Sequence, residues 1–496
     1  MKKITLLSVS MLCGVLLLLS FSSKKKETPI IQKPVISVVE CLPAPAVAPN
    51  LITAAAFKLK FGSEPLRVRK SVYSLTTAEI NAIKVGIIKM KSLPYTDPTS
   101  WKYQAAIHGT TMTDNLPSWN TCHRTGESFF FFAWHRMYVY FFERILRAKS
   151  GRANLAQPYW NYQLNAVMPP AYRDKTPSNP LYDGTRSSTI NNGGALPASI
   201  MTAFNNSLDL IPFYTFQTDL NGGPHGSVHT TISGNMAVVT TAAQDPVFWL
   251  HHANIDRLWE EWRSRCNGRA NPTDTAFLNK TYTFFDETGT AVSMKGSDVL
   301  EISTQLNYRY DDRSPVVSCP AGRPAVVTRE SLITQETPVS IIDKSKADFV
   351  NASSAQLEKF IKTKNRKNFD FAQKDVSERL VINFEGVSVE QMPQGVVEVY
   401  INLPEGQAPK ATSNHFVGLL DLFSAEHHSM HSPQHGADVE LDATKAAKAL
   451  GLTLPDLKNA TLSFIAKGAT INGKEQTAEA KVTIRHIRFS IDKYQK

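Results

Sequence analysis

The stretch from residue 245 to residue 262 constrains the fold of this 496-residue chain more than any other part of it. Asp245 is a favourable helix N-cap, and Pro246 follows at the first helical position, where its missing N–H costs nothing. The spacing therefore predicts a helix that begins at this pair. The apolar face of that helix carries four large side chains, Phe248, Ile255, Trp259 and Trp262.

Two adjacent histidines flank this apolar face. At about 100° per residue, His251 lies about 60° to one side of Phe248 and His252 about 40° to the other, so the helical pattern does not choose between them. Upstream, His225 and His229 form an i, i+4 pair, which a helix places on one side, one turn apart. Three imidazoles from two helices make a favourable site for copper or zinc.

A second group of three histidines lies further upstream, at His108, His123 and His135. We predict a helix that opens at Asp97–Pro98 and turns His108 inward, and an apolar helix over residues 129–147 that carries His135. For each histidine the alternative is an ordinary buried residue in an aromatic core. Two groups of three in one chain indicate two metals side by side.

Two motifs in these regions carry a resemblance to a known family. The run Asp245-Pro-x-Phe-Trp-x-His-His252-x-x-x-Asp256 resembles the second copper signature of the tyrosinase family, which includes catechol oxidases and polyphenol oxidases. Phe131-Phe-Ala-Trp-His135-Arg136, followed by Glu143, is similar to the first copper signature. The resemblance runs from about residue 95 to residue 312.

The resemblance implies a mainly helical catalytic domain, a four-helix bundle around a dinuclear type 3 copper site. It implies a tyrosinase or catechol oxidase type of oxidoreductase, which uses dioxygen to oxidise small phenols and catechols to o-quinones. The alternatives are a tyrosinase with full monophenol hydroxylase activity and a hemocyanin-like carrier that binds dioxygen without turnover. A zinc hydrolase is disfavoured, because Gly226 stands where that class needs a glutamate base.

Residue by residue, the resemblance assigns six copper ligands. It places His108, His123 and His135 on the first copper and His225, His229 and His252 on the second. The spacing to Asp256 selects His252 as the ligand and leaves His251 as its neighbour. We expect Asp256 to fix local orientation by hydrogen bonding, with a simple helix salt bridge as the alternative. Met236 resembles the methionine that follows the second ligand pair in the family.

The position of His123 departs from the family pattern. The middle ligand usually lies nine residues before the third, where this chain has Gly126, whereas His123 lies twelve residues before His135. No other histidine stands between His108 and His135, so His123 remains the candidate. Some members crosslink a cysteine to this histidine, but Cys122 is directly adjacent to it and we predict no such bond.

The second copper region departs from the family at residues that bear on the substrate. Plant-like members often have a glutamate four residues before the first histidine of this site, where it helps to deprotonate a monophenol. Asn221 occupies that position, and Gly226 replaces the asparagine that follows the histidine. Asp219 is nearby but differently placed. These residues favour the oxidation of diphenols over the hydroxylation of monophenols.

Composition and pattern divide the chain into five parts. An apolar run after Met1-Lys2-Lys3 predicts a signal peptide over 1–22, or an uncleaved anchor, so we expect an exported protein, periplasmic or secreted. The other four parts are a linker over 23–60, a catalytic domain over 61–318, a second linker with one helix over 319–375 and an all-β domain over 376–496.

The β domain resembles the C-terminal β-sandwich of plant polyphenol oxidases, in which a similar domain covers the copper site. The resemblance therefore implies an intramolecular lid. Phe416 is the candidate for a side chain that enters the site, although we favour an ordinary core position for it. The histidine-rich run over 427–435 is interpreted as a solvated loop rather than a metal site.

Charge and cysteine usage limit the partners and the compartment. The net charge of +10 is interpreted as a basic surface, because no stripe of Lys and Arg interleaved with aromatic residues indicates nucleic-acid binding. Beyond the N-terminal run, no segment is long and apolar enough to span a membrane. In an exported chain, Cys41, Cys122, Cys266 and Cys319 can form two disulfides or remain thiols.

Overall fold

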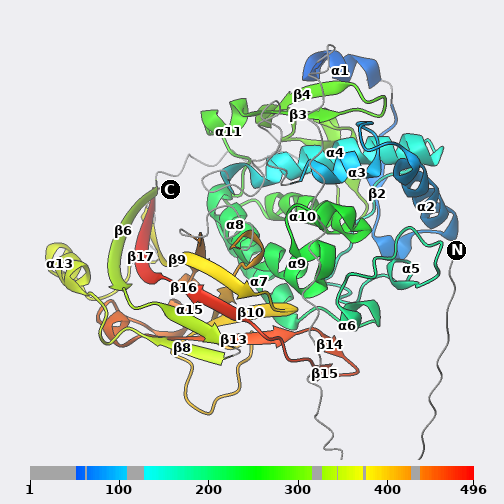
Figure 1. The fold of residues 1–496 in the computed structure, drawn as a ribbon. Helices are drawn as coiled ribbons and strands as arrows, with labels where there is room; N and C mark the ends of the chain where they lie inside the picture. The colour runs from blue at the N-terminus through cyan, green and yellow to red at the C-terminus, as the bar shows by residue number, and fades with distance from the viewer. Residues whose placement is uncertain are drawn as a thin grey trace, which may run out of the picture. The chain divides into compact units, whose positions relative to one another are not determined.

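The computed structural model describes residues 52–61, 64–108, 128–314, 327–342, 344–371, 376–425 and 436–495 (Figure 1). The predicted signal peptide, Cys122, His123 and the histidine-rich run over 427–435 lie outside the described residues. All described residues belong to one compact unit, Cys41–Lys496. Among them, no helix combines the length and the apolar character needed to cross a membrane.

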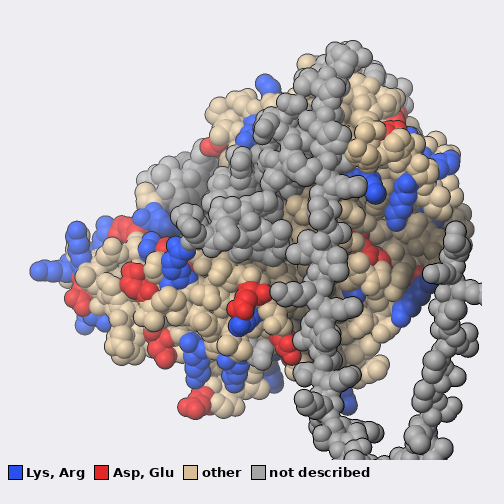
Figure 2. Space-filling model, in the orientation of Figure 1, with Lys and Arg blue, Asp and Glu red and all other residues tan. Residues whose placement is uncertain are grey.

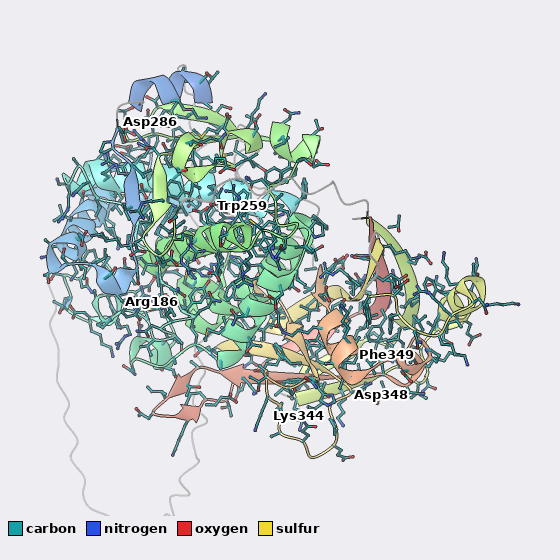
Figure 3. All side chains as sticks on the ribbon, turned by 180° about the vertical axis from the view of Figure 1, so that it is seen from behind. Arg186, Trp259, Asp286, Lys344, Asp348 and Phe349 are labelled. Carbon is teal, nitrogen blue, oxygen red and sulfur yellow. The ribbon has the colours of Figure 1, made fainter. Side chains whose placement is uncertain are left out.

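Two long helices, α4 (Phe131–Ser150) and α10 (Pro246–Ser264), pack against each other at the centre of the catalytic part. The helix α10 begins as predicted, because the Asp245 carboxylate accepts a hydrogen bond from the N–H of Val247 (2.8 Å). The helix α4 ends at Ser150 and is capped by Gly151, whose φ of 71° favours glycine. Trp259 of α10 is fully buried among the helices (Figure 3).

Shorter helices surround this pair. They are α2 (Thr77–Ser92), α3 (Trp101–Ala106), α7 (Ala198–Asp209), α8 (Phe213–Leu220) and α9 (Gly226–Ile232), with the π-helical turn η4 (Asn221–His225) between α8 and α9. The helix α2 begins with a capping box, in which Thr76 and Glu79 exchange hydrogen bonds between side chain and backbone. This agrees with the helix start predicted near Thr76.

The helix predicted from Asp97–Pro98 begins later than expected. Ser100 caps α3, since its hydroxyl accepts a hydrogen bond from the N–H three residues on (3.1 Å). The Asp97 carboxylate instead accepts from the N–H of Thr99 (2.7 Å), which stabilises a turn rather than a helix start. Because α3 ends at Ala106, His108 lies two residues beyond the helix and not within it.

Early and late segments of the catalytic part pair with each other in two small sheets. In one, β1 (Ile52–Thr53), β4 (Ala291–Lys295) and β3 (Thr281–Phe285) lie in that order, and in the other β2 (Arg67–Arg69) pairs in parallel with β5 (Tyr308–Tyr310). Phe57 of α1 (Ala54–Phe61) is buried against Phe141, with ring centroids 5.4 Å apart. Residues 52–60, predicted as the end of a linker, are therefore part of the folded domain.

The C-terminal part is a β-sandwich, as predicted. One sheet has the order β11-β10-β13-β8 and the other β6-β17-β9-β16-β7, with β12 also paired to β9. Phe384 and Phe464 from opposite sheets pack with ring centroids 5.9 Å apart in the core between them. The strands are β6 (Val327–Gln335), β7 (Val339–Ile342), β8 (Lys344–Asp348), β9 (Val376–Gln391), β10 (Gly395–Ile401), β11 (Phe416–Leu419), β12 (Ala437–Asp442), β13 (Thr461–Gly468), β16 (Lys481–Ile484) and β17 (His486–Gln495).

The linker predicted over 319–375 is folded over much of its length. β6 pairs with β17, β8 pairs with β13, and α13 (Ala355–Lys364) packs on β6. The strand β8 has the sequence Lys-Ser-Lys-Ala-Asp and buries only Ala347. It therefore has no hydrophobic alternation from which a strand could be predicted. The C-terminal domain therefore includes the residues from 327 onward.

The sheet that contains β10 and β11 packs on the helices of the catalytic part (Figure 1). The hydroxyl of Thr230 in α9 donates a hydrogen bond to the carbonyl of Gly395 at the start of β10 (2.7 Å). Ala195 and Thr470 exchange two backbone hydrogen bonds of 2.7 and 2.9 Å. The C-terminal domain is thus attached to the catalytic part at more than one place.

Charges of both signs are distributed over the surface. On the face drawn in Figure 2, the described Lys and Arg side chains are interspersed with Asp and Glu. Elsewhere among the described residues, several cations pair with acidic side chains, such as Lys493 with Glu330 (2.5 Å) and Arg144 with Glu287 (2.7 Å). On that face, the net positive charge is therefore spread out rather than gathered in one stripe.

Candidate metal centre

Six histidines converge at the centre of the helical part, and each side chain is at most 1% exposed. They come from the turn after α3, from α4, from η4 and α9, and from α10. In chain order they are His108, His135, His225, His229, His251 and His252. The structure therefore brings together five of the six predicted ligands, together with His251.

The first group consists of His108, His135 and His252, whose potential ligand atoms all lie within 4.8 Å of one another. His108 Nδ1 lies 2.6 Å from the carbonyl oxygen of Val239, and His135 Nδ1 lies 2.9 Å from that of Phe131. A carbonyl only accepts, so both Nδ1 atoms carry the proton. The two Nε2 atoms, 3.5 Å apart, are left as electron-pair donors.

The second group consists of His225, His229, His251 and His252, again with ligand atoms within 4.8 Å of one another. His229 Nδ1 donates a hydrogen bond to the carbonyl of Met236 (2.7 Å), which leaves its Nε2 for a metal. Met236 thus acts on the site through its backbone. His252 belongs to both groups, so two metal positions would lie side by side.

The chemistry of these side chains fits a metal. Among the described residues, His229 Nε2 and both ring nitrogens of His251 and His252 are buried without a hydrogen-bond partner, which is unusual for buried polar atoms. Burial lowers the pKa of His108 to about 4 and that of His251 to about 3. The imidazoles are therefore neutral at neutral pH, which is the form that binds copper or zinc.

A π-helical turn positions the second group. Such turns are rare and recur at functional sites. Pro224 lies inside η4 and has no N–H to donate, so the regular α-helical ladder is interrupted just before His225. His225 and His229 consequently face each other with ring centroids 4.8 Å apart and planes at 72°. The sequence had predicted only an ordinary helical pair here.

Asp256 lies in a buried network rather than in a helix salt bridge. Its carboxylate accepts hydrogen bonds from Arg136 Nε (2.5 Å), Arg69 Nη1 (3.1 Å) and Tyr308 (2.6 Å). Burial raises the pKa of Asp256 and the two guanidinium groups lower it, with a net shift below the usual value. Because Arg136 follows His135 in α4, this network ties α10 to the neighbouring ligand helix.

Two residues of the C-terminal domain lie at the histidines. The ring of Phe423 stacks on that of His229, with centroids 4.0 Å apart and planes at 11°. The Asp421 carboxylate accepts hydrogen bonds from the N–H of Phe423 (3.0 Å) and of Ser424 (3.4 Å). Asp421 is 2% exposed, and burial raises its pKa to about 6. Its Oδ1 occupies the space that a side chain at Gly226 would fill.

Phe416, the sequence-based candidate for this position, lies elsewhere. It is the first residue of β11 and packs against Tyr400, with ring centroids 5.6 Å apart. This is the core position that we favoured. Sequence reasoning missed Phe423 and Asp421, because an aspartate two residues before a phenylalanine, just after a buried strand, occurs in many turns.

Asn221 and Asp219, two residues expected to bear on the substrate, lie in different surroundings. Asn221 is 7% exposed at the start of η4, and its Oδ1 has no hydrogen-bond partner among the described residues. Asp219 lies in α8, where its carboxylate accepts a hydrogen bond from the hydroxyl of Ser207 (2.6 Å). Asp219 lines a cavity between the catalytic part and the C-terminal domain. Among the described residues, Asp219 therefore has a hydrogen-bond partner in α7 and none among the histidines.

Comparisons with known proteins decide the family. The common central domain of tyrosinase matches residues 98–209 and 188–265, and the polyphenol oxidase middle domain matches residues 271–318. The chain belongs to the tyrosinase and polyphenol oxidase family. A further family, described as a domain of unknown function, matches residues 330–490.

Individual tyrosinase family members resemble different lengths of the chain. A tyrosinase of Hahella sp. is 33% identical over 314 residues, which cover 53% of this chain and 66% of that protein. A latent chloroplastic polyphenol oxidase of Prunus armeniaca is 26% identical over 427 residues, covering 73% of this chain and 70% of that one. The chain therefore spans about two thirds of the length of these relatives.

The solved structure of a latent apple tyrosinase has the same fold. It matches with a TM-score of 0.59 and 20% sequence identity, and covers 86% of this chain and 97% of that one. The match includes both the helical part and the C-terminal β domain, which confirms the predicted fold class. Tyrosinases and polyphenol oxidases are oxidoreductases with a dinuclear type 3 copper site, and the histidine groups described above fit that cofactor.

Proposed function

We propose that this protein oxidises o-diphenols to o-quinones with dioxygen at a pair of coppers. The observation that carries the proposal is the pair of overlapping histidine groups, in which His252 is common to both. Two overlapping groups support two metals close enough to act on one small molecule. His123 is proposed as the remaining ligand of the first copper and His252, rather than His251, as the third ligand of the second.

The protein contributes geometry and exclusion of water. Backbone carbonyls of Val239, Phe131 and Met236 fix the proton of three imidazoles on Nδ1, so each Nε2 points to the centre. Phe131 and Phe248 are fully buried beside the histidines and keep the centre apolar. Copper, when bound, supplies the exchange of electrons between dioxygen and the phenolic substrate.

A single preparation tests this function. The purified full chain, loaded with copper, should contain two coppers per chain and should consume dioxygen while 4-methylcatechol turns into its quinone. Metal analysis, an oxygen electrode and the visible absorption of the quinone measure the three quantities. Reversible dioxygen binding without quinone would identify a carrier and contradict the proposal.

We further propose that diphenols are preferred over monophenols. The support is Asn221, which supplies an amide where a carboxylate would deprotonate a monophenol, and Asp219, which is hydrogen-bonded to Ser207 in α7. Replacing Asn221 by Glu should raise the rate with tyramine relative to that with 4-methylcatechol. Asn205→Glu, on the exposed side of α7, is the matched control. Brisk hydroxylation of tyramine by the unmodified protein would contradict this preference.

We also propose that the C-terminal domain is an intramolecular lid. The support is Phe423, whose ring lies flat on His229, where a substrate ring would have to approach the second histidine group. Cutting the chain between residues 315 and 326 and removing the domain should raise catechol oxidation several-fold at constant copper content. Unchanged activity after clean removal would show that the domain serves another purpose.

We also propose that the protein is exported from the cell. Cys266 is disulfide-bonded, with its partner outside the described residues, and disulfides persist mainly in oxidising compartments. Cell fractionation and mass spectrometry of the N-terminus test this part. Full-length protein that retains residues 1–22 in the cytoplasmic fraction would contradict it.

A further inference from the structure

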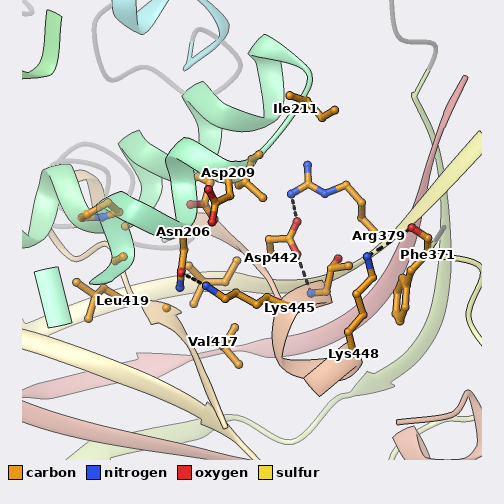
Figure 4. A pocket seen from close by; sticks show the side chains of 18 of the residues that line it. Asn206, Asp209, Ile211, Phe371, Arg379, Val417, Leu419, Asp442, Lys445 and Lys448 are labelled. Carbon is orange, nitrogen blue, oxygen red and sulfur yellow. Dashed lines mark hydrogen bonds and ion pairs between the residues drawn. The ribbon is translucent and has the colours of Figure 1, made fainter. Parts of the chain in front are cut away.

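A cavity of about 430 Å³ lies between the catalytic part and the C-terminal domain, and none of its lining residues is a histidine (Figure 4). Its walls come from both sides. α7, α8 and η4 form one wall, and β9, β11, β12 and α15 (Thr444–Leu450) form the other. The volume lies within the range of pockets that hold small molecules, about 300–1,000 Å³.

The cavity has an apolar part. Leu419 of β11 and Leu441 of β12 are buried at 0% and 2% exposure and line it together with Val417, Leu210 and Pro224. Ile211, at its edge, is 38% exposed. An apolar body of the size of a short alkyl chain or one ring would bury surface here and gain the usual hydrophobic free energy.

The acidic side chains of the cavity already have partners. Asp442 pairs with Arg379, and Glu378 pairs with Arg366. Asp209 pairs with Arg265 (3.2 Å), and Asp219 accepts a hydrogen bond from Ser207. Burial also raises the pKa of Asp219, so its negative charge is disfavoured. An incoming cation would therefore have to compete with arginines for three of these carboxylates.

The two lysines of the cavity are in the opposite situation. Lys445 Nζ donates to the amide oxygen of Asn206 (2.7 Å), and Lys448 Nζ donates to the carbonyl of Phe371 (3.5 Å). Both acceptors are neutral, and neither lysine has an ion pair among the described residues. In Figure 4, Lys445 and Lys448 extend to different sides of the cavity, with Arg379 and Asp442 between them. The cavity thus offers two ammonium groups that are hydrogen-bonded to neutral acceptors and not ion-paired among the described residues.

We propose that this cavity binds a small amphipathic anion, with a carboxylate or sulfonate head at Lys445 or Lys448 and an apolar body against Leu419 and Leu441. The charge arrangement selects an anion over a cation, and the volume limits the body to a short chain or a single ring. The binding site itself does not depend on the catalytic function proposed above.

The position of the cavity couples such a ligand to the lid, and this part rests on the proposed function. Gly223 and Pro224 line the cavity and lead directly into His225. On the other wall, β11 leads through Leu420 to Asp421 and Phe423. Because both walls are needed to enclose the ligand, it binds the closed arrangement better than an open one. By linkage, its binding stabilises the closed, latent state.

Three probes with one tail and different heads test the site on the full-length protein. Octanoate, octylammonium and octanol are titrated calorimetrically below their micelle concentrations. Octanoate should bind to one site per chain, about tenfold more tightly than octanol. Octylammonium should bind more weakly than octanol. Equal or tighter binding of octylammonium would overturn the choice of an anion.

Substitutions at exposed positions locate the binding. The double variant Lys445→Gln, Lys448→Gln and the single variant Ile211→Asp, which adds a carboxylate at the cavity edge, should each weaken octanoate binding at least about tenfold. The matched control is Lys344→Gln, Lys474→Gln, at two exposed lysines of the same domain outside the cavity. Octanoate binding that is unchanged in both cavity variants would overturn the site.

The coupling has its own readout. Octanoate should lower the rate of catechol oxidation by the full-length protein, and the double lysine variant should lose this inhibition. Inhibition that persists in that variant would arise at the copper site and would overturn the coupling. If the protein binds octanoate as predicted but oxidises no catechol, the proposed function fails and the anion site stands.

Discussion

Asp421 occupies the space that a side chain at position 226 would need: its Oδ1 lies closer to the ideal Cβ position of Gly226 than two non-bonded atoms can approach. Asp421 is buried, and its carboxylate accepts hydrogen bonds from the N–H groups of Phe423 and Ser424. Gly226 follows a predicted copper ligand, and Phe423 stacks on another. The absence of a side chain at position 226 thus allows the C-terminal domain to seat Phe423 on His229.

A methyl group at this position should therefore unseat the lid. In Gly226→Ala, Asp421 has to move, and the turn that holds Phe423 moves with it, so catechol oxidation by the full-length protein should rise several-fold. Gly222→Ala is the control, because the nearest atom to its added Cβ is the carbonyl oxygen of Glu440 at 3.9 Å. An oxygen electrode measures both variants. Equal rates in Gly226→Ala and Gly222→Ala would separate position 226 from the lid.

The ring of Phe423 is expected to contribute directly to latency. A stacked aromatic pair contributes about 0.5–1.5 kcal/mol beyond its buried area, so Phe423→Ala should shift the closed state toward the open one by up to about tenfold. The initial rate with 4-methylcatechol should rise, with copper content unchanged. Phe416→Ala removes a ring from the core beside Tyr400 and should lower thermal stability instead. A larger rate increase in Phe416→Ala would contradict the assignment.

The two adjacent histidines of α10 should differ in their effect on metal binding. His252 is the proposed third ligand of the second copper, so His252→Ala should lose that copper and abolish oxidation. His251→Ala should retain measurable copper, because the second group keeps three other imidazoles. Copper is measured by metal analysis after dialysis. Equal copper loss in the two variants would show that the spacing to Asp256 does not identify the ligand.

Asp256 should matter for stability more than a surface carboxylate does. Asp256→Asn leaves the buried guanidinium groups of Arg69 and Arg136 without their full counter-charge, which costs about 3–5 kcal/mol. Asp312→Asn removes a partly exposed partner of Arg257 and Arg313 and should cost no more than about 1 kcal/mol. Urea unfolding of the two variants compares the costs. Similar midpoints would contradict the role given to the network.

The copper-free protein should lose stability as the pH falls. Burial holds the pKa of His108 at about 4 and that of His251 at about 3, whereas unfolded histidines take up protons near pH 6.5. The unfolded state therefore binds more protons, and the free energy of unfolding should decrease from about pH 6.5 down to about pH 4. Urea midpoints at several pH values measure the slope. A flat profile would contradict the burial of neutral imidazoles.

Local signals made the central helices predictable. Asp245 and Pro246 start α10 by contacts within one turn, and the capping box of α2 is equally local. The predicted start of α3 was wrong because two local signals compete. Asp97 can cap a helix or close a turn, and here it closes the turn while Ser100 caps the helix. Which of the two is stabler depends on packing that no short pattern records.

The features that the sequence did not predict depend on contacts between distant parts of the chain. Phe423 reaches His229 only because β11 pairs with β10 and that sheet packs on α9, so its role depends on contacts between residues almost two hundred positions apart. The strand β8 buries one side chain, so its alternation was invisible. The predicted ligand His123 lies outside the described residues, and its place on the first copper stays a prediction.

The parallel pairing of β2 with β5 has a practical consequence for any shortened form of the protein. Arg69 is opposite Tyr310 in this pair, and its guanidinium contacts Glu143 of α4 and Asp256 of α10. The first and last segments of the helical domain are thus fastened to each other and to both ligand helices. A chain that starts after residue 69 or stops before residue 310 would leave α4 and α10 without this brace, whereas a cut between residues 315 and 326 preserves it. Release of the C-terminal domain can therefore leave the metal-binding helices in register.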